Sequence, residues 1–506
     1  MIKPAHQTAL YFLAILLYSY FCLLPFIGEA GINGDDILHI NTISLNYLKN
    51  GVNSYDDFIG LARARGFLSF AYQNIFSFFN QDWQFLLLYA VLLHTLNGLI
   101  IFIIFKKIIQ NHLSFLLALL YLSYPMQYEV VTWISASLFE LCFFLSLICL
   151  YLSINTKIKL IFKSVLISIL IFIGFHLYEV IIVMTPVLLF FEVNKNKSAD
   201  ENSAIHYLTA SLPIIIMGIY VFAILGAQQS TLSRELGFTE LFHLPYLMNS
   251  YRLVFSNLIG WQYLLMIYHN HGVWLNLIYC AAIAGSFYFI YSGQLLNLKI
   301  DKKTILGISL FCIFLLIALP IIYLPSLFNK NWMPSRLTLF PWFAFCLLII
   351  ACLAIYKNHA IYFVICLVIV FNALVMRNIM LSYIGSSIID NQIGAKIASC
   401  PQVLSGSKVN VSVEGLGKDG YGYYRPFFVG LKNESVRLSA TASILQHRPD
   451  LQSKYSEQIG FNNIIYLQNT ACATKKEDSH SSLLFCFSVD DTVMPPPIKL
   501  IYSNCW

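Results

Sequence analysis

The segment GINGDDILHI, residues 31 to 40, places two adjacent carboxylates, Asp35 and Asp36, directly after the first apolar stretch of the chain. A carboxylate held beside a reacting hydroxyl can take its proton as a general base. An acid at a helix N-terminus is also a favourable cap, worth about 0.3 to 1 kcal/mol, but a cap accounts for one carboxylate better than for two. The pair is therefore the first candidate for a catalytic site, and either residue could be the base.

The arginines are the second group with informative chemistry. A guanidinium is planar and forked, so it binds phosphate through two hydrogen bonds, whereas a lysine ammonium acts as a point charge. On the membrane topology inferred below, every arginine lies outside or at the outer membrane edge, and the cytoplasmic loops use lysine. Taken singly, each can equally pair with an acid or a lipid headgroup, but as a set they predict a phosphorylated ligand handled from outside. They are Arg63, Arg65, Arg234, Arg252, Arg336, Arg377, Arg425, Arg437 and Arg448.

Composition sets the class of protein that carries these residues. Hydrophobic residues make up 58% of the 506 positions and charged residues 11%, which excludes an ordinary soluble domain. The net charge of +6 is modest and indicates no nucleic-acid partner. Because a membrane-spanning helix needs about 17 to 25 apolar residues, we predict an all-α polytopic membrane protein with about 11 transmembrane helices. The predicted spans are 9–27, 84–105, 113–124, 137–154, 160–175, 177–193, 207–226, 273–294, 304–324, 337–356 and 360–380.

Lysines in alternate short loops predict the orientation of these spans. Cytoplasmic loops retain basic residues, and lysines mark every second loop from the N-terminus to Lys357. This pattern places the N-terminus in the cytoplasm, and it places both the 28–83 loop and everything after about residue 381 outside. Because no small-residue cleavage site follows the first span, we expect that span to be retained as an anchor.

The loop from 28 to 83 is far longer than a simple connection between helices. It contains two segments with helical apolar spacing, DDILHINTISLNYLKNG and ARARGFLSFAYQNIFSFFN. Both predict amphipathic helices that lie in the plane of the membrane interface. Asp35 and Asp36 begin the first of them.

The tail from 385 to 506 is polar and contains short alternating apolar runs, such as KVNVSVEG and FNNIIYLQ, which predict strands of a small α/β domain. We therefore divide the chain into a transmembrane domain, 1–384, and an exterior domain, 385–506. Four of the twelve cysteines lie in this tail, and an even number in an oxidising compartment predicts two disulfides. Our first guess among the three connectivities pairs Cys472 with Cys486 and Cys400 with Cys505, and free thiols are the alternative.

Four short segments in the first 190 residues place polar residues in or beside the predicted spans. ARGFLSFAYQ leads into the second interfacial helix, and HTLNGLIIF lies on the second span. YPMQYEVVTWISAS and FHLYEVIIVMTPVLL turn the chain outside after the third and fifth spans. Two of these residues, Glu129 and Glu179, are acids at outer helix ends, where an ionisable group near the membrane is costly and is a functional hypothesis by default. The residues of interest in the four segments are Arg65, His94, Asn97, Glu129, Trp133 and Glu179.

These segments, the paired acids and the long exterior loop together resemble the membrane-embedded GT-C glycosyltransferases that use polyprenyl-phosphate sugars. Among bacterial members, the layout is most similar to the serotype-converting O-antigen glucosyltransferases, whether phage-borne or chromosomal. Past residue 200 the similarity lies in architecture alone. The resemblance implies an enzyme of the bacterial inner membrane whose C-terminal domain is periplasmic. Its donor would be a sugar, first of all glucose, on undecaprenyl phosphate, and its acceptor would be lipid-linked O-antigen.

The resemblance also implies roles for individual residues. Asp35 or Asp36 would be the general base. The donor phosphate would bind Arg65. Apart from the resemblance, Arg336, which enters the tenth predicted span from outside, and then Arg63 are the next phosphate candidates. No cofactor is required, and a divalent metal ion that bridges the acids and the phosphate is left open. The substrate-binding candidates are Glu129, Glu179, Trp133 and His94, although His94 and His176 fit packing histidines better than ligands.

Two other classes of function remain as alternatives. A transporter or flippase for lipid-linked sugars would also have many spans, but no internal repeat with matched broken helices is found. An O-antigen polymerase or ligase is closer in chemistry, but we expect its main exterior loop late among the spans rather than after the first.

Overall fold

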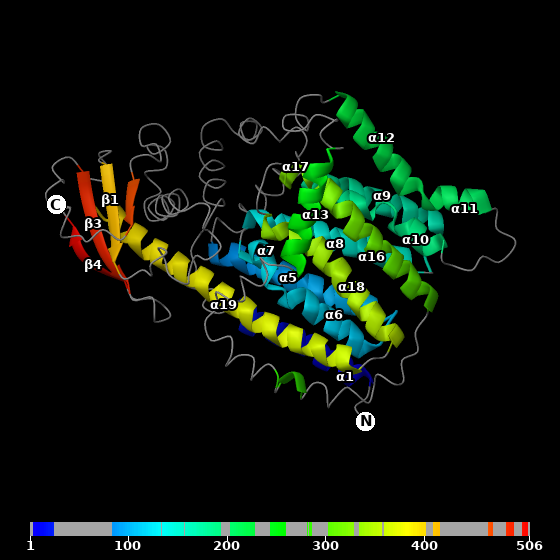
Figure 1. Cartoon of the computed structure of the whole chain (residues 1–506), viewed down its shortest axis with the longest axis horizontal. Helices are drawn as coiled ribbons and strands as arrows, with labels where there is room; N and C mark the ends of the chain where they lie inside the picture. The colour runs from blue at the N-terminus through cyan, green and yellow to red at the C-terminus, as the bar shows by residue number, and fades with distance from the viewer. Residues whose placement is uncertain are drawn as a thin grey trace.

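The computed structural model describes a bundle of helices and one β-sheet, which a single long helix joins (Figure 1). The described residues are 4–24, 83–132, 134–155, 157–193, 203–227, 243–259, 281, 283–285, 302–327, 333–356, 359–400, 408–414, 464–468, 482–489 and 498–503. The first helices are α1 (Pro4–Leu23), α5 (Trp83–Phe105), α6 (Asn111–Ser123), η3 (Pro125–Gln127), α7 (Tyr128–Thr132), α8 (Ile134–Ile154), α9 (Leu160–Leu177), η4 (Glu179–Met184) and α10 (Val187–Val193). They are followed by α11 (Ser203–Ala210), α12 (Leu212–Ala227), α13 (Leu244–Ile259), α16 (Lys302–Ile322), α17 (Leu324–Leu327), η7 (Ser335–Thr338), α18 (Leu339–Tyr356) and α19 (His359–Ala398).

Six described helices are long and apolar enough to cross a membrane, and the bent pair of α11 and α12 makes up to seven. The six segments lie in α5, α8, α9, α16, α18 and α19, close to six of the predicted spans. The fold is therefore that of a helical membrane protein. The predicted total of eleven spans is not reached among the residues that the structure describes, because α1 and α6 are shorter apolar helices and most of 273–294 lies outside them.

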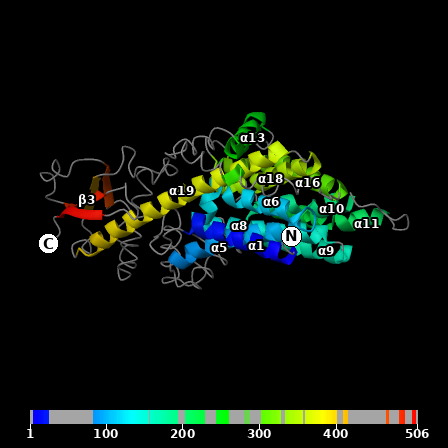
Figure 2. The ribbon, with the colours of Figure 1, turned by 90° about the horizontal axis from the view of Figure 1, so that it is seen from below.

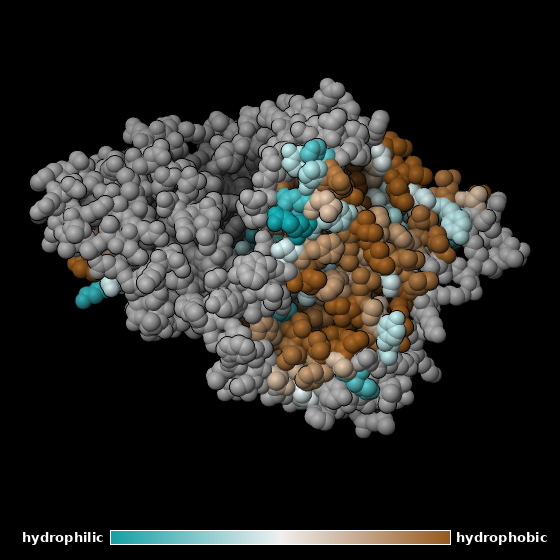
Figure 3. Space-filling model, viewed as in Figure 1, coloured by the Kyte–Doolittle hydropathy of each residue, from teal (hydrophilic) through white to brown (hydrophobic). Residues whose placement is uncertain are grey.

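The surface of the bundle has the character that lipid requires. On α16, exposed apolar side chains recur every three or four positions, which places them on one face of the helix. Figure 3 shows a broad hydrophobic surface over this part of the bundle. A contiguous exposed apolar face of this kind marks a surface for lipid or for another protein. The exposed residues on α16 are Leu306, Leu310, Ile313, Ile317 and Ile321.

The predicted sixth span, 177–193, is not a single helix, so that prediction is wrong. The chain forms the 3-10 helix η4 and then begins again as α10, with Pro186 between the two. A proline has no backbone N–H to donate, so it starts a helix more readily than it continues one. The segment still returns along the bundle, since α10 packs against α8 and α16.

The helix α19 links the bundle to the tail. It spans 40 residues, and at 1.5 Å per residue a helix of that length extends about 60 Å, roughly twice the hydrocarbon thickness of a bilayer. Figures 1 and 2 show it leaving the bundle as a straight rod and ending beside the sheet. It runs unbroken through residues 384 and 385, where we predicted a domain boundary, and its C-terminal end contacts β3 (Ser482–Val489) and β4 (Ile498–Ser503).

The tail contains a four-stranded mixed sheet in the order β2-β1-β3-β4. The strands β1 (Lys408–Glu414) and β2 (Ile464–Gln468) coincide with the predicted runs KVNVSVEG and FNNIIYLQ. They pair in parallel, β1 also pairs in parallel with β3, and β3 pairs antiparallel with β4. Cys400 and Cys486 each take part in a disulfide bond. Their predicted partners, Cys505 and Cys472, lie outside the described residues, so the pairing stays a prediction.

Aromatic side chains fix one end of the bundle, where η3, α7 and η7 lie, and we call this end the η7 end. The rings of Tyr124 and Trp342 stack with centroids 3.8 Å apart. The indole N–H of Trp342 donates to the carbonyl of Leu120 at 2.9 Å, which joins α18 to the end of α6. The hydroxyl of Tyr124 donates to the carbonyl of Leu258 at 3.1 Å, which attaches α13 at the same place. The sequence had not predicted α13, which lies in the loop between the predicted spans 207–226 and 273–294.

Candidate functional site

Two residues singled out in the sequence, Glu129 and Arg336, meet at the η7 end. Nη1 of Arg336 lies 3.2 Å from Oε2 of Glu129, although the residues are 207 positions apart in the chain. Glu129 lies in the first turn of α7, and Arg336 lies in η7, which leads directly into α18. The ion pair therefore joins the turn between α6 and α8 to the start of α18.

The two turns also cap one another through backbone groups. The backbone N–H of Arg336 donates to Oε2 of Glu129 at 3.2 Å, and the backbone N–H of Glu129 donates to Oγ of Ser335 at 3.4 Å. The first N–H groups of a helix have no partner within the helix and carry partial positive charge. A carboxylate beside them satisfies donors and balances that charge, so Glu129 stabilises both the turn and the guanidinium.

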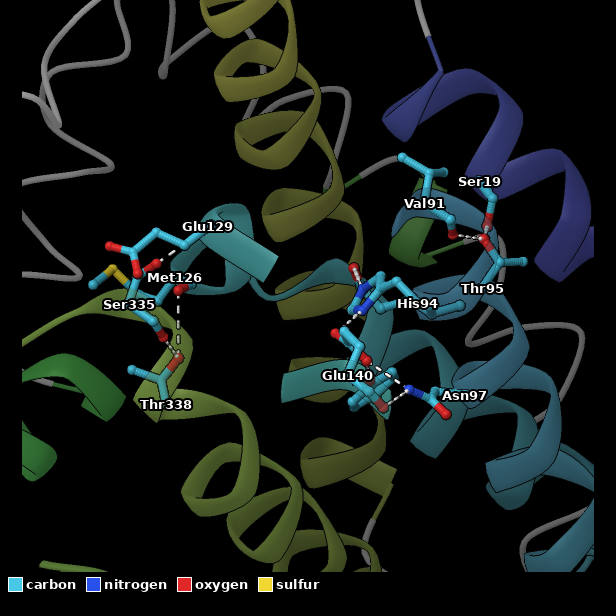
Figure 4. Close-up of polar contacts among 12 residues, drawn as sticks. Ser19, Val91, His94, Thr95, Asn97, Met126, Glu129, Glu140, Ser335 and Thr338 are labelled. Atoms are coloured by element: carbon cyan, nitrogen blue, oxygen red, sulfur yellow. Dashed lines mark hydrogen bonds and ion pairs between the residues drawn. The ribbon is translucent and has the colours of Figure 1, made fainter. Parts of the chain in front are cut away.

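A further contact holds the turns in register. The hydroxyl of Thr338 donates to the carbonyl of Ser335 at 2.6 Å and approaches the carbonyl of Met126 at 3.3 Å. Figure 4 shows Glu129, Met126, Ser335 and Thr338 gathered where α7 meets η7. The site is therefore built on short helical turns that hydrogen bonds tie to each other.

Burial differs sharply between the two members of the ion pair. The side chain of Glu129 is 4% exposed, whereas that of Arg336 is 30% exposed. Burial raises the pKa of the neighbouring Tyr128 hydroxyl well above its ordinary value, and the Glu129 carboxylate raises it further. Tyr128 therefore stays neutral. The site presents a guanidinium that solvent can reach, held from behind by a buried carboxylate.

Glu179 lies on an element that packs against the same helix, α8. It is half-buried and is the first residue of η4, directly after the end of α9. The elements η4 and α7 both contact α8. The structure therefore leaves Glu179 as a substrate-binding candidate, although with less support than the Glu129 and Arg336 pair.

His94 does not fit the prediction of substrate contact, because both of its ring nitrogens already have partners in a buried polar network of the core. Its Nδ1 lies 2.6 Å from Oε1 of Glu140, and its Nε2 lies 3.5 Å from the carbonyl of Leu122. The other carboxylate oxygen of Glu140 accepts hydrogen bonds from Asn97 at 2.6 Å and from Tyr121 at 2.7 Å. Figure 4 shows this network apart from Glu129. His94 is thus a packing residue.

The sequence reasoning missed Glu140, although a signal was present. It is an acid within a predicted span, 137–154, and such residues in membrane helices are rare and usually paired. Its carboxylate has three side-chain neighbours on α5 and α6, and it is 0% exposed. These contacts make it an anchor between helices rather than part of an open site.

The remaining predicted site residues lie outside the described residues. They are Asp35, Asp36, Arg63, Arg65 and Trp133. Within the part of the chain that the structure describes, no group of three or more His, Cys, Asp and Glu side chains could hold a metal ion.

The glycine-rich run GLGKDG, residues 415–420, follows β1 directly and has the spacing of a phosphate-binding loop. Such a loop must open a helix. No helix after β1 is among the described elements, and the run itself lies outside them, so the run supports no assignment.

Comparison with models of known protein families, with curated protein sequences and with solved structures found no match to this chain. The class of the protein, a helical membrane protein, therefore rests on its own helices. Any activity must be argued from the site.

We predict that Glu140→Ala lowers the stability of the bundle by about 3 to 5 kcal/mol, because His94, Asn97 and Tyr121 lose a buried acceptor together. Thermal unfolding of the purified protein in detergent measures the effect. Ser146→Ala on the same helix is the control, since its hydroxyl bonds to the carbonyl of Cys142 one turn earlier. Equal melting temperatures for the two variants would contradict the anchoring role.

Proposed function

We propose that this chain is a polyprenyl-phosphate-dependent glycosyltransferase of the bacterial inner membrane. It transfers a sugar, with glucose as the first candidate, from undecaprenyl phosphate to a hydroxyl of the O-antigen repeat unit on the periplasmic face. The observation that carries the proposal is the ion pair of Glu129 and Arg336, which presents a part-exposed guanidinium at one end of an apolar bundle. The sequence alone made Glu129 a candidate for substrate binding and Arg336 a candidate for phosphate binding.

Arg336 suits the phosphate of the donor lipid. The lipid chain lies in the membrane, so its phosphate lies at the surface, and the η7 end offers a cation beside the N-terminus of α18. Helix N-termini favour anions through their partial positive charge and their N–H groups. As the sugar leaves, the phosphate gains charge, and a guanidinium that is already oriented stabilises this charge with little reorganisation.

Glu129 is a positioning residue in this proposal. Its carboxylate contacts Nη1 of Arg336, and the Arg336 side chain remains 30% exposed. A long, flexible side chain held in one orientation loses less freedom when a ligand binds. The pairing also lowers the cost of keeping an almost buried carboxylate beside the membrane.

Asp35 and Asp36 supply the general base in the proposed reaction. The acceptor hydroxyl oxygen attacks the anomeric carbon, the bond from that carbon to the phosphate oxygen breaks, and undecaprenyl phosphate leaves with the bonding electrons. One carboxylate takes the hydroxyl proton. A single displacement of this kind inverts the anomeric centre. A divalent metal ion that bridges the acids and the phosphate remains an alternative to direct binding by arginine.

The distribution of charge supports the proposed orientation. Arg336, Arg252 and Arg377 lie at or near the η7 end, since α13 contacts η7 and Arg377 donates to the carbonyl of Phe21 in the last turn of α1. Lys106 and Lys107 lie after α5 at the opposite end. Lysines at the end of α5 are expected if that end is cytoplasmic. The arginines at the η7 end do not follow from the same rule, and they fit a phosphorylated ligand on the outer side.

The tail sheet fits a role in acceptor binding. The helix α19 contacts η3 and α7 and continues to β3 and β4. The same helix therefore connects the η7 end to the sheet. We propose that the tail selects the acceptor saccharide that reaches the site.

Transfer of labelled glucose from undecaprenyl-phosphate glucose to lipid-linked O-antigen by the purified protein tests the proposal. The wild type should transfer the label. We expect Asp35→Asn combined with Asp36→Asn to slow transfer about 10²- to 10⁴-fold, the usual contribution of a general base. Full activity in this double variant would show that neither Asp35 nor Asp36 is the general base. Lipid movement across vesicles without transfer would favour a transporter, and polymer formation would favour a polymerase.

In the same assay, Arg336→Lys should reduce kcat about 10²-fold, because lysine keeps the charge but loses the fork that holds both Glu129 and a phosphate. Arg252→Lys is the matched control. It makes the same change at an exposed position of α13, where Arg252 bonds to Asn249 three residues away. Loss of activity in the control alone would contradict the role given to Arg336.

A further inference from the structure

Gln127 is a buried side chain whose polar atoms have no partner among the described residues. It is 0% exposed, and neither its Nε2 nor its Oε1 makes a hydrogen bond within that part of the chain. It ends η3, two positions before Glu129, in the turn that packs against η7. A primary amide can donate two hydrogen bonds and accept two. Here the side chain uses none of them.

Such a group is unusual in a native protein. Buried polar atoms nearly always find partners, and those that do not call for an explanation such as a ligand or a bound water. A methionine of similar length would fill the same space without the penalty of an unpaired amide. A fold under no other constraint has no physical reason to keep glutamine at this position.

Two neighbouring elements also carry unpaired buried polar atoms. Within the ranges that the structure describes, Oδ1 of Asn257 has no partner, while its Nδ2 lies 3.3 Å from the carbonyl of Met333, just before η7. The hydroxyl of Tyr323, between α16 and α17, also has none. The helix α13, which carries Asn257, contacts both η7 and α17. Gln127 and Asn257 therefore lie on two elements, η3 and α13, that both contact η7, the segment that carries Arg336.

We propose that Gln127, assisted by Asn257, binds hydroxyl groups of the carbohydrate that the enzyme handles. The inference rests on the proposed function and adds the residues that recognise the sugar. A hydroxyl both donates and accepts a hydrogen bond, as an amide does, and neither is charged, so this pair of groups fits a neutral sugar rather than its phosphate. Because the amide is fully buried, the surrounding turns must open locally for the carbohydrate to reach it.

Gln127→Met tests the inference. Because the amide has no partner in the free protein, the variant should melt at the same temperature as the wild type or higher. Its KM should rise about tenfold for whichever substrate bears the recognised hydroxyl, which is the loss expected for one hydrogen bond. Separate titrations of undecaprenyl-phosphate glucose and of lipid-linked O-antigen distinguish the donor sugar from the acceptor sugar. Gln110→Met, at the opposite end of α6, is the control for the substitution itself.

A second readout does not depend on turnover. In the wild type, undecaprenyl-phosphate glucose should raise the melting temperature more than undecaprenyl phosphate does, and if the donor sugar is recognised, Gln127→Met should remove that difference. An unchanged KM for both substrates in Gln127→Met would overturn the inference while leaving the transfer reaction in place. Lower melting temperatures in both Gln127→Met and Gln127→Leu would also overturn it, because the amide would then have a structural partner. A wild type that neither binds nor transfers would overturn both proposals.

Discussion

A charged group that leaves water must find a partner, and this requirement determines how the η7 end is built. Removing a carboxylate from water costs several kcal/mol even after the protein has relaxed around it. Glu129 is almost fully buried, and it meets this cost with the guanidinium and the backbone N–H of Arg336. The same contacts fix where α18 begins relative to α7. The proposed donor site depends on this ion pair, because it holds a cation in one orientation at the end of an apolar bundle.

The core of the bundle also contains a buried carboxylate with partners, but there the carboxylate joins helices. Glu140 is also buried, but its partners His94, Asn97 and Tyr121 are all enclosed within the bundle. Glu129 instead has a partner that is 30% exposed. An acid whose partners are all buried can only join helices, whereas one that holds a part-exposed arginine can orient it toward a ligand. This difference in exposure, rather than the presence of an acid in the membrane, separates the anchor from the site.

Much of the bundle could be predicted from the sequence, because long apolar runs such as 84–105 and 360–380 have few alternatives to a spanning helix. The break at Pro186 could not be predicted from hydrophobicity, because the apolar run continues on both sides of it. The helix α13 was missed because its Asn, Ser and Arg residues interrupt the apolar run. Its buried face nevertheless includes Leu253, Val254 and Leu258.

The candidate site could be predicted in its members but not in its geometry. Glu129 and Arg336 were both singled out, but nothing in their spacing indicates that residues 207 positions apart touch. Only the packing of α7 against η7 shows this. Gln127 lies within the quoted segment YPMQYEVVTWISAS and was not singled out, since an unpaired buried amide is recognisable only when its surroundings are known.

The central claim is that the η7 end binds the phosphate of the donor lipid. The most direct test is a structure of the protein in a lipid nanodisc with undecaprenyl-phosphate glucose bound, determined by cryo-electron microscopy. The account predicts the phosphate about 3 Å from the guanidinium of Arg336, with Glu129 still paired to it and Asp35 or Asp36 facing the anomeric carbon. A phosphate bound elsewhere, with Arg336 contacting only protein, would contradict it.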